Sequence, residues 1–403
     1  MKRTPFATLA KLAMLGAILL LAAAAGCAPK SGAETLPSPS AGAQSPTETP
    51  YAAPTMDTDA LPAYAPASPE PTPIPTPVPT PTPTPTPTPA RAVTIAVGGD
   101  VLPAGNIGAR IEAGDYGSVL DPELAARMRA ADVTMVNLET AVSERGAPIP
   151  EKTYTFRTPP QNLAFLREWL GTDVVSLANN HTFDYGRDAF LDTLVIPGEY
   201  GLAVIGAGED YDAACRPFIA EAGGVRIAFF AVNQILSYTD WPATATRAGH
   251  LIARTTEEVA ALGRAVAKAR ETCDYVIVYL HWGVELDRTP SERQVSTARA
   301  LIDAGADVIL GAHPHVVQSF EYYKGKPIAY SVGNFLFNSR NPELAVVFLH
   351  IENGAVTLEA VPCLVSGTLT SPAGSERAQS MLTAWSALSR NAHFDANGRL
   401  VEE

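Results

Sequence analysis

Histidine, carboxylate and amide side chains recur in this 403-residue chain just past runs of apolar residues. Four of the seven histidines lie at such places, namely His181, His281, His313 and His315. Oxygen-bearing side chains at equivalent places are Asp100, Glu139 and Asn180. Neutral imidazole with carboxylate or amide oxygen is a ligand set that suits Zn, Mn or Fe. One such histidine is usually a hydrogen-bonded structural residue, but this many together predict a divalent metal site.

The segment 174–186 shows the pattern in one place. An apolar run at 174–178, which we expect to be a buried strand, ends in Asn179, Asn180 and His181. Asp184 and Gly186 follow as turn residues. Sites in α/β sheets form at the carboxyl ends of strands. A polar turn whose side chains bond the backbone would explain this segment equally well. The residues at the other strand ends are therefore needed to choose between a turn and a functional site.

His313 and His315 are separated by a single residue. Alternate residues of an extended backbone point to the same side, so we expect both imidazoles to reach one site. The remaining histidines do not follow apolar strands, and we expect structural or surface roles for His250, His350 and His393.

Apolar strands alternate with helical segments along the region that carries these side chains. The expected strands are 93–97, 133–136, 174–178, 226–232, 275–280, 308–310 and 328–332. The expected helices are 122–131, 162–170, 257–271 and 291–304. Such alternation predicts βαβ units and a largely parallel sheet with right-handed crossovers.

A hairpin signature follows, with strands at 345–351 and 356–365 joined at Asn353-Gly354. Together with the preceding strands it suggests a second sheet packed on the first. Residues 378–388 fit a closing helix, and we expect the last residues to be frayed.

The N-terminus has the features of a targeting segment. Lys2, Arg3 and Lys11 precede an apolar run at 12–25, and Gly26-Cys27 follows. The Cys after Ala-Ala-Gly resembles a bacterial lipobox, so we expect residues 1–26 to be a lipoprotein signal peptide and Cys27 to be lipidated. Ordinary secretion and an uncleaved anchor are the alternatives. The predicted location is extracytoplasmic, on the membrane at the bacterial cell surface.

Residues 27–91 are rich in Pro, Thr, Ser and Ala. Proline lacks an amide donor and fixes its own backbone, so this stretch predicts a disordered, extended tether with no core. Residues 92–403 remain and suffice for one large α/β domain.

Charge and cysteine content narrow the function. A formal net charge of −13 argues against nucleic acid and anionic membrane surfaces as partners, although a metal site can still attract an anionic substrate. Apart from Cys27 the chain has Cys215, Cys273 and Cys363, without C-x-x-C spacing. This predicts no thiolate zinc site and at most one disulfide, with mainly buried thiols.

The order of these motifs resembles the CapA family, which is named for poly-γ-glutamate capsule synthesis and is similar to calcineurin-like metallophosphoesterases. The resemblance covers residues 93–337 and is carried by Gly99-Asp100, Asn137-Leu138-Glu139, Asn179-Asn180-His181, His281-Trp282-Gly283 with Glu285, Gly311 with His313-Pro314-His315, and Gly333-Asn334-Phe335. It implies an α/β fold: a four-layer αββα sandwich of two mixed sheets with metals at the strand ends.

The resemblance also implies roles for the residues. Asp100 and His315 would hold one metal, and Glu139 would bridge it to a second. The remaining ligands of that second metal would be Asn180, His281 and His313. His181 would protonate a leaving group or stabilise the transition state, held in place by Asp184. Leu102 departs from the Asp-x-His motif of the superfamily, so a mononuclear site is an alternative to a dinuclear one.

Three further residues have expected roles near the site. Arg157 follows an aromatic segment of the family and would bind a carboxylate or phosphate, with a surface ion pair as the alternative. Glu285 would orient His281, since ligating imidazoles usually donate to a carboxylate or carbonyl. Asn334 would contact substrate, unless it serves only in a turn.

These features predict a lipid-anchored, metal-dependent hydrolase or transferase that acts on an anionic envelope polymer such as poly-γ-glutamate, within a capsule-synthesis membrane complex. The bond cleaved would be an amide or a phosphoester. A non-catalytic polymer-binding or export component is the alternative, and a phosphoesterase is a second one.

Overall fold

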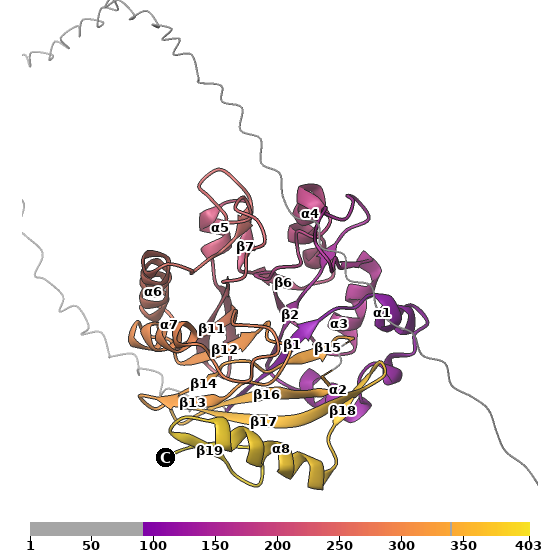
Figure 1. Ribbon diagram of the computed structural model, residues 1–403. Helices are drawn as coiled ribbons and strands as arrows, with labels where there is room; N and C mark the ends of the chain where they lie inside the picture. Colours follow the sequence, from indigo (N-terminus) through magenta and orange to yellow (C-terminus); the bar gives the residue numbers. More distant parts are fainter. Residues whose placement is uncertain (1–91, 339–340) are drawn as a thin grey trace, which may run out of the picture. The chain divides into compact units, whose positions relative to one another are not determined.

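The computed structural model describes residues 92–338 and 341–403 (Figure 1). The predicted signal peptide, Cys27 and the tether at 27–91 lie outside the described residues. No helix in the described part of the chain is long and apolar enough to cross a membrane.

The first sheet has eight strands in the order β18-β17-β16-β1-β2-β5-β6, with β15 also paired to β1. Strands β1, β2, β5, β6 and β15 run parallel, whereas β16 pairs antiparallel with β1 and is followed by antiparallel β17 and β18. Their bounds are β1 Val93–Val101, β2 Val133–Leu138, β5 Val174–Ser176, β6 Ala203–Ile205, β15 Asn334–Leu336, β16 Glu343–Glu352, β17 Ala355–Ser366 and β18 Leu369–Pro372.

The second sheet has six strands in the order β13-β14-β12-β11-β9-β8. Strands β9, β11, β12 and β14 are parallel, and the outer strands β8 and β13 are antiparallel. The bounds are β8 Phe218–Ala222, β9 Val225–Asn233, β11 Tyr275–His281, β12 Val308–Ala312, β13 Phe320–Tyr323 and β14 Lys326–Ala329.

The two sheets pack face to face, because their strands alternate between two apolar faces. In β1, Ile95 and Val97 join Phe229 of β9 in one buried cluster between the sheets, while Ala96 turns to the opposite side. Phe230 turns away from the first sheet in the same manner. Both sheets are thus apolar on both faces, and each needs a cover of helices.

Helices cover the two outer faces and complete the αββα sandwich that the family resemblance implies (Figure 1). On the first sheet lie α1 Gly105–Glu112, α2 Pro122–Arg129, α3 Leu163–Glu168 and α4 Gly186–Glu199. On the second lie α5 Tyr211–Cys215, α6 Thr256–Arg270 and α7 Glu292–Asp303. Capping boxes at Thr255 and Ser291 begin α6 and α7.

The C-terminal region corrects two expectations. The hairpin β16–β17 extends the first sheet instead of building the second, because β16 pairs with β1. The last residues are not frayed: β19 Ala392–Phe394 pairs with β20 Leu400–Glu402, and Phe394 packs against Trp385 of α8. Helix α8 spans Ser375–Leu388. These apolar contacts fix the end of the chain.

Short elements complete the fold. They are β3 Ala141–Val142 with β4 Arg157–Thr158, β7 Ala207–Gly208 with β10 Gly249–His250, and the 3-10 turns Tyr116–Ser118 and Pro160–Asn162. All three cysteines of the described chain are free thiols; Cys273 and Cys363 are buried and Cys215 is partly buried, as expected.

Candidate metal centre

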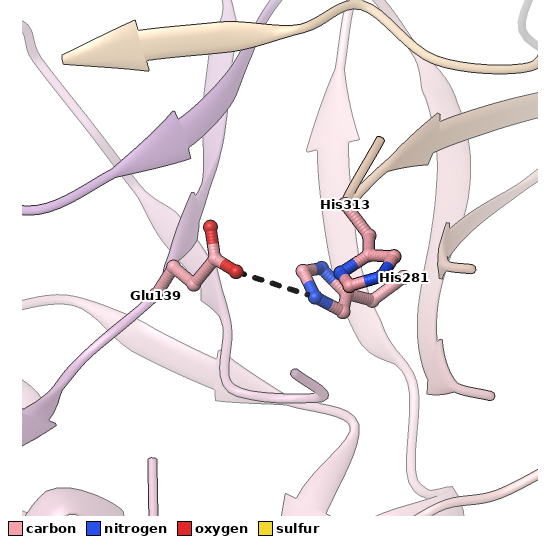
Figure 2. Close-up of side chains that lie close together, drawn as sticks. All are labelled: Glu139, His281 and His313. Carbon is pink, nitrogen blue, oxygen red and sulfur yellow. Dashed lines mark ion pairs between the residues drawn. The ribbon is translucent and has the colours of Figure 1, made fainter. Parts of the chain in front are cut away.

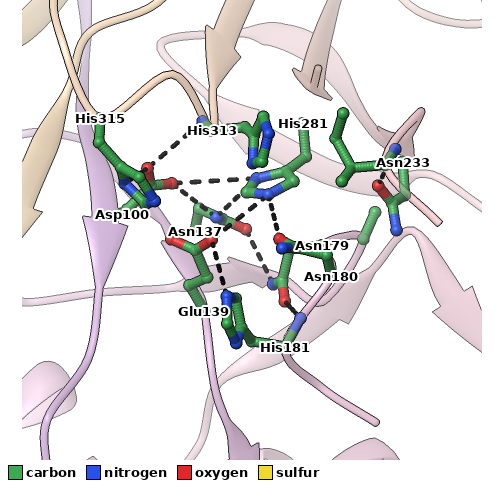
Figure 3. Close-up of polar contacts among 12 residues, drawn as sticks. Asp100, Asn137, Glu139, Asn179, Asn180, His181, Asn233, His281, His313 and His315 are labelled. Atoms are coloured by element: carbon green, nitrogen blue, oxygen red, sulfur yellow. Dashed lines mark hydrogen bonds and ion pairs between the residues drawn. The ribbon is translucent and has the colours of Figure 1, made fainter. Parts of the chain in front are cut away.

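Both sheets deliver polar side chains to one place (Figure 3). Asp100 lies near the carboxyl end of β1, Glu139 follows β2, and Asn180 lies past β5. From the second sheet, His281 ends β11, and His313 and His315 follow β12. All six predicted metal ligands therefore come together, since the parallel strands of both sheets end on the same side.

Two glycines allow Asp100 to reach this position. A Cβ on Gly99 would lie 1.9 Å from the carbonyl oxygen of Gly333, and one on Gly98 would lie 2.5 Å from the ring of Phe335. The pairing of β1 shifts register between Val97 and Asp100, where β15 comes close. The missing side chains thus permit the approach of β15 that sets Asp100 beside Asn334.

The side chains form two groups that could each hold a metal ion. One group is Glu139, His281 and His313, and the other is Asp100, Glu139 and His315; the ligand atoms in each lie within 4.8 Å of one another. Figure 2 shows the Glu139 carboxylate directed toward the two imidazoles of the first group. Glu139 is shared by both groups, the arrangement expected for a bridging ligand.

Asn180 joins the group that contains His281. Its Oδ1 lies 2.8 Å from Nε2 of His281, and the same nitrogen lies 3.4 Å from Oε1 of Glu139. In the other group, Nδ1 of His315 lies 3.4 Å from Oδ2 of Asp100. The division of the six residues matches the one that the family resemblance implies.

The site contains buried polar atoms that have no hydrogen-bond partner among residues 92–338 and 341–403. They are both carboxylate oxygens of Glu139, Nδ1 of His313 and Nδ2 of Asn334. An unsatisfied buried polar atom is costly, and such atoms in a folded protein call for an explanation such as an ion. A cation between these nitrogen and oxygen atoms would satisfy Glu139 and His313, so the residues fit a divalent metal.

The electrostatics fit the same conclusion. Burial, followed by the charge of Asp100, raises the pKa of Glu139 well above its usual value. Burial and the neighbouring histidines lower the pKa of His281, and burial lowers that of His313 to about 3. Both imidazoles are therefore neutral at neutral pH, the form that binds metals.

His181 lies at the edge of this centre. Its Nε2 is 4.0 Å from Oε1 of Glu139, and its Nδ1 is 2.6 Å from Oδ2 of Asp184. Phe156 stacks on the imidazole with 4.2 Å between ring centroids. Burial lowers the pKa of His181 although Asp184 opposes this effect, so the resting imidazole is neutral at neutral pH.

Sequence reasoning missed two asparagine roles and a lysine. Asn137 donates from Nδ2 to Oδ1 of Asp100 at 2.8 Å and lies 3.2 Å from Nδ1 of His281. Asn179 donates to Oδ1 of Asn137 at 3.2 Å. Lys152 pairs with Asp184. Asn137 and Asn179 belong to strand-end motifs that the sequence shows, although these motifs gave no role to either residue. Lys152 lies in an irregular loop, where no pattern pointed to it.

The expected role of Glu285 is wrong. Glu285 is exposed, and Nδ1 of His281 faces Asn137 and Asp100. Gly283 has φ 91°, so the chain turns away from the site before it reaches Glu285. The extended geometry expected at His313 and His315 is also wrong, because their φ values are 96° and 56°. The turn directs one imidazole to each metal group.

The substrate-binding roles expected for Arg157 and Asn334 stay predictions, and the structure shows their contacts within the protein. The guanidinium of Arg157 lies 4.3 Å from the ring centroid of Tyr185, and Nη1 donates to the carbonyl of Arg145 at 3.4 Å. In the described chain, no hydrogen bond or ion pair joins Arg157 to the predicted ligands. Asn334 contacts Nδ1 of His315 at 2.7 Å and is buried, so it orients that imidazole.

Two stacked mixed sheets with helices outside, and carboxylates and imidazoles gathered at the strand ends, define a four-layer αββα protein with a candidate metal centre. Within this class, the chain belongs to the family described as bacterial capsule synthesis protein PGA_cap, which matches residues 94–339.

Several proteins are similar in sequence. Capsule biosynthesis protein CapA of Bacillus anthracis is 38% identical over 201 residues, which is 48% of this chain and 47% of that protein. PGA biosynthesis protein CapA of Bacillus subtilis (strain 168) is 33% identical over 240 residues, 58% of this chain and 62% of that protein. The chain thus spans about half to three fifths of the length of these relatives.

A solved structure of a hypothetical protein from Thermus thermophilus matches with a TM-score of 0.40 and 19% identity, covering 68% of this chain and 99% of that chain.

Proposed function

We propose that this protein is a metal-dependent hydrolase or transferase that acts on an anionic polymer of the cell envelope, and that it serves capsule synthesis. The observation that carries the proposal is the buried carboxylate of Glu139, whose two oxygens have no hydrogen-bond partner among the described residues and which is common to two ligand groups. Divalent cations bound by these groups would supply activation of the scissile group and neutralisation of the charge that develops on it.

The residues of the site have two kinds of proposed role, metal binding and proton transfer. Asp100 and His315 would hold one cation, and Asn180, His281 and His313 the other, with Glu139 common to both. His181 has its Nε2 toward Glu139 and its Nδ1 on Asp184, so it is placed to take up a proton at Nε2 and deliver it to a leaving group.

The substrate proposal rests on the family and on names of relatives. The Bacillus subtilis relative is named for PGA biosynthesis, which makes poly-γ-glutamate the first polymer to test. A phosphoesterase is the second candidate, favoured by the αββα fold with its ligands at the strand ends. A non-catalytic polymer-binding or export component is the third, and Leu102 in place of the superfamily histidine favours it.

A substrate screen of the metal-loaded protein separates these candidates. Poly-γ-glutamate, phosphodiesters and phosphomonoesters are offered to the wild type and to His181→Asn, which lacks the imidazole that would carry the proton and whose folding is checked by circular dichroism. Shortening of poly-γ-glutamate by the wild type alone supports the proposal. Turnover confined to phosphoesters favours the second candidate, and polymer binding without turnover favours the third.

We also propose that the domain works outside the cytoplasm on a lipid anchor at Cys27, within a capsule-synthesis complex. The support is the signal-like segment at 1–26 and the Pro/Thr-rich stretch at 27–91. Labelled palmitate should attach to the wild type and not to Cys27→Ser in cells. Equal labelling of both chains would refute the anchor.

A further inference from the structure

We propose that Lys152 is a positioning residue of the metal centre: through Asp184 it sets the tautomer and orientation of His181, and it holds the main chain of Asn180. The inference rests on the proposed function, which gives His181 and Asn180 their roles. Lys152 was not among the candidates that the sequence suggested, because it lies in a loop without a periodic pattern.

The contacts of Lys152 are largely buried. Its side chain is 13% exposed and that of its partner Asp184 is fully buried. The ammonium nitrogen bonds Oδ1 of Asp184 and also the main-chain carbonyl of Asn180. A lysine ammonium has three donors and no acceptor, so one group can fix a carboxylate and a carbonyl together. Lys152 therefore links the predicted ligand Asn180 to the residue that orients His181.

The carboxylate of Asp184 is divided between its neighbours. Oδ1 receives Lys152, whereas Oδ2 receives the main-chain amide of Phe156 at 2.7 Å and faces Nδ1 of His181 at 2.6 Å. An ionised carboxylate can only accept, so a contact this short requires the proton to lie on Nδ1 of His181. The lone pair of the neutral imidazole is then on Nε2, which is directed toward Glu139.

Lys152 keeps this arrangement in place by its charge. Its Nζ is 3.3 Å from Nδ1 of His181, but both atoms carry protons, so this contact is not a hydrogen bond. The two donors instead share the one carboxylate. Without Lys152, Asp184 would be a buried carboxylate that has lost its cationic partner, and removing one partner of a buried ion pair is strongly destabilising. Rotation of the carboxylate toward other donors would reduce this cost and would release Nδ1 of His181 from its acceptor.

The loop that carries Lys152 is docked on the same aspartate. The amide of Ile149 donates to the main-chain carbonyl of Asp184 at 2.9 Å, and Tyr238 donates to the carbonyl of Pro150 at 2.9 Å. A Cβ on Gly146 would lie 2.0 Å from the carbonyl oxygen of Tyr185, so only glycine permits this approach. The loop is thus built to deliver its lysine at this point.

Nitrogen spectroscopy of the histidine rings tests the inference without a substrate. The full chain is labelled with ¹⁵N in histidine only, and long-range proton–nitrogen spectra are recorded metal-free and with zinc. His181→Gln assigns the signal. We expect His181 of the wild type to be a single tautomer with its proton on Nδ1. Lys152→Met, which keeps the length but not the charge, should lose this single tautomer and bind zinc more weakly at the group containing Asn180.

The controls separate a positioning role from general damage. Arg145→Met removes a cation from the same loop. Within the described residues its guanidinium contacts Asp192 and the main-chain carbonyl of Asp188, so the His181 spectrum of this variant should match the wild type. Lys152→Arg keeps the charge and should restore the tautomer at least in part. If Lys152→Met does not fold, Lys152→Gln replaces it, because its amide keeps a donor but not the charge.

An unchanged Nδ1–H tautomer and unchanged zinc affinity in a folded, uncharged Lys152 variant would overturn the inference. A different result would refute the proposed function: the wild type shows the expected tautomer of His181 but cleaves none of the substrates offered. The two failures are therefore distinguishable.

Discussion

His315 and Asp100 lie side by side, with 3.4 Å between Nδ1 of the imidazole and Oδ2 of the carboxylate. Burial by itself would lower the pKa of His315, but the hydrogen bond to Asp100 and the charges of Glu139 and Asp100 outweigh it and raise the pKa to about 10. In the metal-free protein this imidazole therefore keeps its proton at neutral pH. A metal must displace that proton, since only neutral imidazole is a ligand.

Metal affinity should consequently rise with pH. The raised pKa means that the proton is bound below about pH 10, so a lower pH favours the proton over the metal. We expect the apparent affinity of the group containing His315 to increase by about tenfold per pH unit between pH 6 and 8 for each proton released. Calorimetry in buffers of different ionisation enthalpy measures the released protons. Affinity independent of pH in this range would contradict the assignment.

The two ligand groups should lose metal in different patterns. Glu139→Gln changes the one residue common to both groups and should therefore empty both. His315→Ala removes a ligand from the group with Asp100 only, so the group with His281 should retain its metal. Elemental analysis of each purified chain gives the stoichiometry. Equal losses in the two variants would show that the groups are not independent.

Leu102 should limit the group that contains Asp100. This group offers three ligands, and Leu102 is the position at which the family resemblance would lead one to expect a histidine. Leu102→His supplies an imidazole two residues past Asp100 and should tighten metal binding at that group, with Leu102→Met as the control for altered packing. Competition with a chelator measures the change. An affinity that does not exceed that of the Met control would show that the position does not reach the metal.

Gly99 should be intolerant of any side chain. A methyl group there would lie 1.9 Å from the carbonyl oxygen of Gly333, so Gly99→Ala must push β15 away from β1. We expect a loss of about 1–3 kcal/mol or more in the free energy of unfolding, and weaker metal binding through Asp100.

Gly198→Ala is the matched control, because outside its chain neighbours and the nearby backbone of its own helix an added Cβ would meet no described atom within 4 Å. Its free energy of unfolding should be unchanged or slightly raised. Denaturant unfolding of both variants makes the comparison, and equal stabilities would refute the steric argument for Gly99.

Much of the fold could be predicted, because buried strands and helices leave a regular pattern of apolar residues in the sequence. The strands carrying Val97, Val136, Phe230 and Leu280 were expected within a few residues, as were α2, α3, α6 and α7. Helix α4 was missed: a turn motif precedes it and Pro197 interrupts its pattern near the end. The β16–β17 hairpin was also assigned to the wrong sheet, since the sequence does not show that β16 pairs with β1.

The candidate ligands could be recognised because each follows an apolar strand. Parallel strands of a sheet end on one side, so residue types at those ends are informative before any coordinates exist. Glu285 shows the limit of this reasoning. It follows His281 by four residues and has suitable chemistry, but the turn at Gly283 carries it into solvent.

Residue types and apolar runs can be read along the chain, so they were enough to show which side chains could bind a metal and that strands would present them together. The division of these side chains into two groups became visible only in the folded protein. The tertiary structure made Glu139 common to two groups, turned His313 and His315 apart through positive φ values, and brought Lys152 to Asp184 across 32 residues. Such contacts depend on how the loops pack against the sheets, which no local pattern encodes.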